Sequence, residues 1–182
     1  MLSICHSDQT TRMQSLSTYC RESIGQTPHA LCHEKEAGKG LQPISQIDEL
    51  EAEMAKCEKV VCPVEHHFTP GLYIRQCDIP AGTFLTSMQH KTEHPFALMQ
   101  GTVKLISSTE GEIILTAPFL GRTLPGTRRI LYAITDAVWI TFHATEETDV
   151  EKIGEAILEP FQNPLISDIP QWRDSLPPSK LP

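Results

Sequence analysis

The chain has 182 residues, of which 40% are hydrophobic and 21% are charged, and its net charge is −8. This length and composition predict one domain with extensions and a packed core. The acidic balance argues against non-specific nucleic-acid binding, which needs a basic surface, but allows a small anionic ligand held by a few arginines. No apolar run approaches the length that spans a bilayer, and the first residues lack a secretory signal pattern. We therefore expect a protein of the reducing cytoplasm that binds neither nucleic acid nor membrane.

The first 44 residues are rich in Ser, Thr, Gln, His and Gly and have no sustained apolar period. We predict that residues 1–44 form a mobile N-terminal arm. The six cysteines of the chain are scattered and form no C-x-x-C pair. In a reducing compartment we expect them to be free thiols.

A helix is predicted in the next stretch, SQIDELEAEMAKCEK. Its start, Ser45 followed by Asp48, is typical of a capping box. Ile47, Leu50 and Met54 then fall on one helical face. We expect this helix to cover one edge of the domain that follows.

From about residue 60 to residue 144, Pro and Gly recur between short runs of β-branched and aromatic residues. Each run predicts a strand, and the runs are LYIRQCDI, TFLTSMQ, TVKLISS, EIILTAPF, RRILYAI and AVWITFHA. Gly111 in STEGEI predicts a hairpin turn. The connections are too short for helices between parallel strands, so this segment predicts an all-β sandwich or barrel.

A second helix is predicted in ATEETDVEKIGEAILEP, where Thr148 precedes an acidic first turn. Val150, Ile153 and Ile157 are spaced for one face, and Pro160 ends the helix. The prolines of the remaining tail exclude a regular helix or central strand. The predicted organisation is therefore an arm at 1–44, a domain with flanking helices at 45–159 whose barrel covers about 60–144, and a Pro-rich tail at 160–182.

Two histidines, His90 and His94, stand in the stretch GTFLTSMQHKTEHPFALMQG. If this stretch is extended, both side chains face the same side of the sheet, and Glu93 points away. A bulge next to Glu93 would turn its carboxylate inward instead. Two imidazoles alone do not complete a tetrahedral zinc site, which wants a third and usually a fourth ligand.

This stretch resembles the first cupin motif, G-x5-H-x-H-x3,4-E-x6-G. The motif spacing is met by Gly82, Met88, His90, His94 and Gly101. Two of the three expected metal ligands differ in type. Met88 stands where the first histidine is expected, and His94 stands where the glutamate is expected.

The second cupin motif is matched more loosely by LPGTRRILYA, where Arg129 stands at the histidine position. More narrowly, about residues 47–157 resemble cupin-like proteins of unassigned role encoded by tailed phages and prophages. The resemblance implies an all-β cupin barrel, the double-stranded β-helix, with flanking N- and C-terminal helices. Arg129 cannot coordinate a metal, and its charge would repel a divalent ion.

We therefore predict a barrel pocket that captures a polar or anionic small molecule without a full cupin metal site. Its predicted ligand-binding residues are His90, His94, Arg129, Tyr132, Tyr73 and Arg75. The alternative is a site for a divalent metal (Zn, Fe, Mn or Ni) formed by His90, His94 and Glu93. Such a site would need help from His66, His67, His143 or solvent.

Two other functions stay open from the sequence. One is a metal-dependent or acid/base cupin enzyme of the isomerase, epimerase or oxygenase type, and the other is a structural or accessory phage protein. The partners we expect are a small-molecule ligand and a second copy of the chain in a dimer. Of the adjacent pair Arg128–Arg129, we expect one side chain on the surface and one in the pocket, and we leave His143 open between a structural role and a pocket role.

Overall fold

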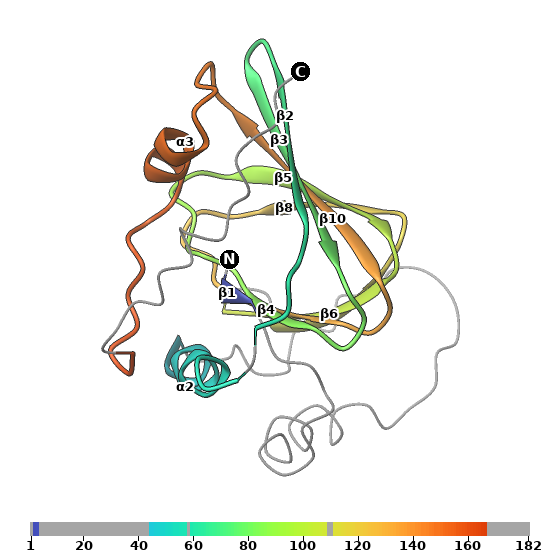
Figure 1. Cartoon of the computed structure of the whole chain (residues 1–182), viewed down its shortest axis with the longest axis vertical. Helices are drawn as coiled ribbons and strands as arrows, with labels where there is room; N and C mark the ends of the chain where they lie inside the picture. Colours follow the sequence, from blue (N-terminus) through green and yellow to red (C-terminus); the bar gives the residue numbers. More distant parts are fainter. Residues whose placement is uncertain (1, 4–43, 58, 109–110, 167–182) are drawn as a thin grey trace.

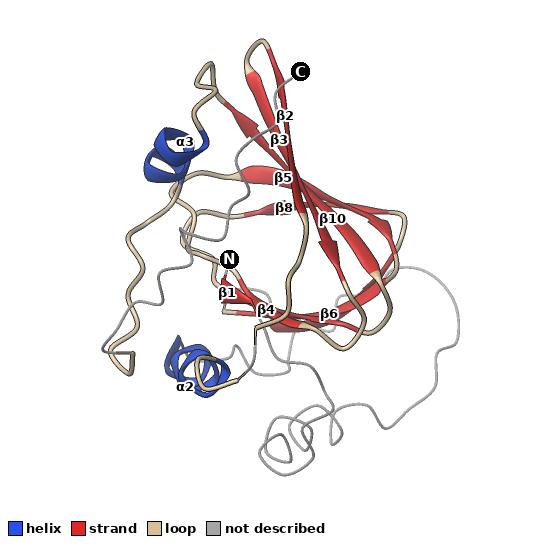
Figure 2. Cartoon of the chain, viewed as in Figure 1, coloured by secondary structure: helices blue, strands red, loops and turns tan. Residues whose placement is uncertain are grey.

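The structure is a computed structural model, and it describes residues 2–3, 44–57, 59–108 and 111–166. The predicted mobile arm and most of the Pro-rich tail lie outside the described residues. Within them the chain forms two five-stranded antiparallel sheets and two helices (Figures 1 and 2). No helix in this described part is long and apolar enough to cross a membrane.

The first sheet has the strand order β1 (Leu2–Ser3), β4 (Phe84–Thr86), β9 (Arg129–Ala133), β6 (Thr102–Ser107) and β7 (Gly111–Thr116). The second has the order β2 (Val64–Thr69), β3 (Leu72–Ile79), β10 (Ala137–Ala144), β5 (His94–Gln100) and β8 (Phe119–Thr123). From β3 to β10 the chain crosses between the sheets at every connection except the β6–β7 hairpin. The order β4-β9-β6-β7 facing β3-β10-β5-β8 is a jelly roll, the double-stranded β-helix of cupins. The predicted fold class is thus confirmed.

One predicted strand needs correction, and two observed strands, β2 and β5, were not among the predicted runs. The run EIILTAPF was predicted as one strand, but its residues lie in two strands of different sheets, β7 and β8. The break falls at Pro118, which has no N–H to donate to a ladder. By contrast, β3 and β10 have the predicted bounds.

The main hydrophobic core lies between the two sheets. It includes Leu98, Val103, Leu131 and Trp139, which are all at most 6% exposed. A second cluster lies on the outer face of the first sheet, where helix α2 (Ile44–Met54) covers it. Figure 1 shows α2 beneath this sheet. Burial of both clusters supplies the main favourable term for folding.

Helix α2 is fixed to the barrel by charged groups as well as apolar ones. Nη1 of Arg128 lies 2.6 Å from Oδ1 of Asp48, and Nη2 lies 2.7 Å from Oε2 of Glu51. The expectation of one surface arginine is therefore wrong, since Arg128 and Arg129 are both buried. The capping box is also corrected, because α2 begins at Ile44, before Ser45, and the Asp48 carboxylate binds Arg128.

Helix α3 (Val150–Ile157) follows the last strand and lies beside one end of the barrel (Figure 1). Its N-cap is Asp149, whose side chain accepts hydrogen bonds from the N–H groups of Glu151 and Lys152. The backbone leaves the helix at Leu158 in an extended conformation. The chain then runs back to α2, where the buried side chain of Asn163 binds.

Candidate metal centre

The inner face of the second sheet carries side chains in rows, because paired residues on neighbouring antiparallel strands point to the same side. The row at one end is largely polar and comprises Phe68, Tyr73, His143, His94 and Thr123. The middle row comprises His66, Arg75, Thr141, Phe96 and Gly121. The third row is largely apolar and comprises Val64, Cys77, Trp139, Leu98 and Phe119. Polar chemistry is therefore concentrated at one end of the barrel.

His94 and His143 meet at the centre of the polar row. Thr141 of β10 pairs with Phe96 of β5. His143 and His94 are the next residues beyond this pair that face inward, each two positions along its own strand. Their ring centroids are 4.5 Å apart, and both side chains are buried. The sheet therefore fixes two imidazoles next to each other.

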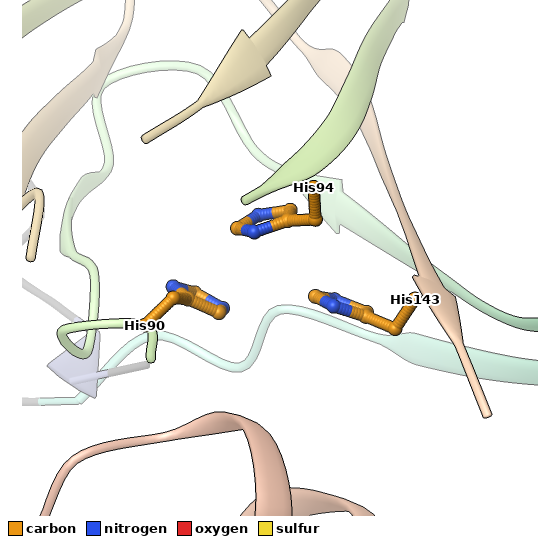
Figure 3. A group of neighbouring side chains, drawn as sticks. All are labelled: His90, His94 and His143. Atoms are coloured by element: carbon orange, nitrogen blue, oxygen red, sulfur yellow. The ribbon is translucent and has the colours of Figure 1, made fainter. Parts of the chain in front are cut away.

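His90 joins this pair from the loop between β4 and β5. Its ring centroid lies 4.2 Å from that of His94 and 5.6 Å from that of His143. One ligand atom from each of the three histidines can be chosen so that all lie within 4.8 Å of one another. Figure 3 shows the three rings converging. This spacing allows one metal ion to contact all three imidazoles.

The nitrogen atoms of the three rings differ in their partners. Nδ1 of His94 lies 3.4 Å from the carbonyl oxygen of Thr92, and the tautomer protonated at Nδ1 would leave Nε2 as an acceptor. Nδ1 of His90 and Nδ1 of His143 are buried and have no hydrogen-bond partner among the described residues. A buried polar atom without a partner is costly, and a metal ion would satisfy both.

Burial lowers the pKa of all three histidines. The pKa of His90 falls to about 3, because burial and then the neighbouring His94 and His143 disfavour its charged form. The pKa of His143 falls to about 4 through burial and then through His94 and Arg75. Burial also lowers the pKa of His94, with a smaller contribution from Arg129. The imidazoles are therefore neutral near pH 7, which is the state that binds a metal.

Arg129, one of the predicted ligand residues, lies on the inner face of the first sheet. Its Nη1 donates to Oγ1 of Thr123 at 2.8 Å, and its Nη2 donates to the carbonyl of Arg122 at 3.2 Å. The guanidinium group also lies over the ring of Phe96, 5.1 Å from its centroid. These contacts hold a positive charge near His94.

Tyr73 and Arg75 lie on the opposite side of the cluster. The Tyr73 ring stacks on His143 with the centroids 5.9 Å apart, and its hydroxyl lies 2.6 Å from Nδ1 of His66. Burial raises the pKa of Tyr73 to about 12, so the hydroxyl stays protonated. Arg75 is paired with His66 on one side and Thr141 on the other. Tyr73 therefore flanks His143 directly, whereas Arg75 lies in the next row, close enough to contribute to the lowered pKa of His143.

Two predicted site residues lie elsewhere. Tyr132 faces the outer side of the first sheet, where its ring contacts Phe84 at 4.5 Å beneath α2. Glu93 is exposed, and its carboxylate accepts a hydrogen bond from Nη1 of Arg122 at 3.1 Å. The structure therefore does not bring Tyr132 or Glu93 to the histidine cluster.

The site residue that sequence reasoning did not select is His143. The sequence signal for His143 was its position in the strand, because it lies on the same face of β10 as Trp139 and Thr141. All three are buried in the structure. Parity alone did not identify which face of this strand lines the barrel. Of the adjacent pair His66 and His67, the first faces inward and is hydrogen-bonded and the second is exposed, as alternation along a strand requires.

The chain was compared with known proteins, and it resembles several solved structures in its fold. No protein-family model and no curated protein sequence matches the chain. The chain is similar to an RmlC-like cupin from Methanocaldococcus jannaschii, with a TM-score of 0.40 and 10% identity, covering 66% of this chain and 94% of that one. It is also similar to a cupin-2 domain protein from Shewanella frigidimarina, with a TM-score of 0.38 and 12% identity, covering 55% of this chain and 98% of that one.

A third similar structure is salicylate 1,2-dioxygenase from Pseudoaminobacter salicylatoxidans, with a TM-score of 0.43 and 15% identity. The match covers 62% of this chain and 32% of the dioxygenase, whose reaction is a property of that protein. The fold assignment itself rests on the strand order given above. Fold and site together define a cupin-type barrel protein with a buried three-histidine cluster at one end.

Proposed function

We propose that the protein binds a divalent transition metal through His90, His94 and His143, and that the metal presents an open position to a small polar or anionic ligand. The observation that carries the proposal is the convergence of the three buried imidazoles, whose ligand atoms lie within 4.8 Å. Imidazole suits Zn, Fe and Ni among the metals considered, and Mn less well. When bound, such an ion supplies Lewis-acid polarisation of an oxygen ligand.

The chain's own residues support a metal-dependent site over a metal-free acid/base site. A general base works best when its pKa lies near the working pH. Burial lowers the pKa of His90 to about 3 and that of His143 to about 4. Imidazoles of this kind are weak bases but remain available as metal ligands at neutral pH.

The positive charges beside the cluster would repel a bare divalent ion, and they favour an anionic ligand that offsets this repulsion. Arg75 contributes to the lowered pKa of His143, and Arg129 to that of His94, so positive charge reaches both sides of the site. A carboxylate or phosphate group is the natural complement of arginine. In the phage setting implied by the sequence resemblance, the bound molecule would be a metabolite or nucleotide of the host, captured in its cytoplasm by a dimer.

A second candidate function is metal-dependent catalysis on such a small molecule. Three protein ligands with a fourth position left for water or substrate are typical of catalytic zinc sites, whereas structural sites are filled by four protein ligands. The three-histidine set favours this candidate over a purely structural barrel. It does not identify the reaction.

Metal content by elemental mass spectrometry tests the proposal. The untagged protein is purified without chelators beside His143→Ala and His90→Ala/His94→Ala, with His67→Ala as the matched control, because His67 is exposed on β2. We expect near-stoichiometric metal in the wild type and the control, and loss of the metal in the other two. A wild type that stays metal-free after incubation with Zn²⁺, Fe²⁺, Mn²⁺ and Ni²⁺ would refute the metal site. Anionic metabolites would then be screened directly against the arginines.

A further inference from the structure

His90 is the one histidine of the cluster that no regular strand holds. It lies in the loop before β5, and its backbone pairs with Leu158, immediately after helix α3. The position of its ring therefore depends on whatever fixes this loop. The contacts on either side of His90 identify that support.

Two backbone hydrogen bonds flank His90, and they connect its loop to the last residue of α3 and to the chain that follows it. The N–H of Lys91 donates to the carbonyl of Ile157 at 2.8 Å, and the N–H of Glu159 donates to the carbonyl of Gln89 at 2.9 Å. A third bond, from the N–H of Gly126 to the carbonyl of His90 at 2.9 Å, holds the loop from the barrel side. The loop thus gains a short antiparallel partner from a segment far away in the sequence.

The same segment has a second anchor at its other end. The side-chain amide nitrogen of Asn163 donates to the carbonyl of Asp48 and to Oε2 of Glu51, both at 2.9 Å. Its side-chain oxygen accepts the N–H of Leu165 at 2.9 Å. Asn163 is 7% exposed, and its amide is fully hydrogen-bonded, as is expected of a buried polar group that fixes a segment in place. We name residues 158–163 the C-terminal strap.

The strap is short and stiff. Only residues 160–162 separate its two anchors, and Pro160 fixes its own φ and favours an extended conformation for the residue before it. Glu51 also receives Nη2 of Arg128 at 2.7 Å. The far anchor is therefore fixed to the barrel through a buried ion pair. Because the connection between Asn163 and Glu159 is so short, a displacement of Asn163 should also displace Glu159.

We infer that the C-terminal strap positions His90 as a metal ligand and that Asn163 is a positioning residue of the metal site. The inference rests on the proposed metal function. Asn163 touches neither the metal position nor the three imidazoles and acts through the backbone hydrogen bond between Glu159 of the strap and Gln89. The consequence is that α3 and the strap must be docked before the third ligand is in place.

The test measures Co²⁺ and Zn²⁺ affinity of the full chain, together with the visible absorption of the Co²⁺ form, which reports its ligand geometry. Two variants loosen the strap. Asn163→Ala removes the far anchor, and Glu159→Pro removes the N–H that binds Gln89. Glu159→Ala is the matched control, because it keeps this N–H. Val103→Ala destabilises the barrel core without touching the strap and controls for stability.

Changes to groups that orient metal ligands typically weaken metal binding about 10- to 100-fold, and we expect a loss in this range for both strap variants. We also expect an altered Co²⁺ spectrum, while Glu159→Ala and Val103→Ala bind within about 3-fold of the wild type. Strap variants that bind metal as tightly as the wild type, with the same spectrum, would overturn the inference and leave the proposed function intact. Equally weak metal binding in Val103→Ala would show that the strap variants lose affinity through lower stability alone, and it would also overturn the inference. A wild type that binds neither ion would overturn the proposed function and this inference with it.

Discussion

Arg128 and Arg129 are adjacent, and both are buried, but they serve opposite faces of the same sheet. Arg128 points outward and binds Asp48 and Glu51 of helix α2, whereas Arg129 points inward and binds Thr123 beside His94. The alternation of side chains along a strand imposes this division. One arginine therefore fastens the helix, and the other contributes charge to the site.

Arg128→Met should destabilise the fold strongly. The substitution leaves the carboxylates of Asp48 and Glu51 buried without their cation, and breaking a buried ion pair in this way costs about 3–5 kcal/mol. Urea unfolding monitored by circular dichroism measures the change. The triple variant Arg128→Met/Asp48→Leu/Glu51→Leu should recover most of the loss, because it removes all three charges together. A loss below about 1 kcal/mol in the single variant would show that the ion pair contributes little to the free energy of unfolding.

Metal should stabilise the wild type through the three histidines. A ligand that binds only the folded state at 100 times its Kd adds about 2.7 kcal/mol to the free energy of unfolding. We expect Zn²⁺ to raise the Tm of the wild type and of His67→Ala, and a chelator to reverse the shift. His143→Ala should show no shift. An equal rise in His143→Ala would assign the binding to surface groups instead.

The metal-free protein should lose stability as the pH falls below about 6.5. Burial lowers the pKa of His90 to about 3 and that of His143 to about 4, whereas both titrate near 6.5 in the unfolded chain. Between these values the unfolded state binds more protons, so acid favours unfolding, and stability is retained above pH 6.5. The linkage amounts to about 1–2 kcal/mol per histidine at pH 5.

Urea unfolding of chelator-treated protein at pH 7.5, 6 and 5 measures this dependence. His143→Gln should show a shallower decline than the wild type, because one titrating group with a lowered pKa is gone. The charged neighbours Arg75 and Arg129 are present in both proteins. A decline of equal slope in the two proteins would place the acid sensitivity outside the cluster.

Gly101→Ala should be strongly unfavourable and Gly154→Ala should not. Gly101 has φ +87°, and an added Cβ would clash with the backbone carbonyl oxygen of Asp136. We expect a loss of at least about 2 kcal/mol, because the backbone itself must shift. At Gly154 in α3 an added Cβ meets nothing within 4 Å, and alanine should stabilise the helix by up to about 1 kcal/mol. Thermal unfolding of the two variants compares them directly, and similar Tm values would contradict the assignment of strain to Gly101.

The barrel was predictable because its signals are local. Alternating runs and Pro/Gly punctuation predicted β3 and β10 with their observed bounds. The face of Tyr132 was also open to a local argument, since residues three apart on a regular strand, such as Arg129 and Tyr132, point to opposite sides. The prediction of a shared pocket for these two residues did not apply that rule.

The rest of the site depends on pairings between distant segments. His143 reaches His94 only because β10 pairs with β5, and a single sequence does not determine this pairing. The burial of Arg128 likewise depends on the docking of α2, whose Asp48 lies 80 residues earlier in the chain. His90 and His94 were found because their spacing lies within one stretch. The third histidine and the strap required the folded chain.

The three ligands of the candidate centre rest on supports of unequal rigidity. His94 and His143 are held by neighbouring strands inside a five-stranded sheet, whereas His90 lies in a loop that only a few backbone hydrogen bonds hold. A loop opens more often than a central strand. A metal held by the cluster would lose His90 more readily than His94 or His143, because the loop that carries His90 opens more often than the two strands. The opening rate of the loop would then limit how long the cluster retains a metal, a kinetic property that the equilibrium geometry of the cluster does not reveal.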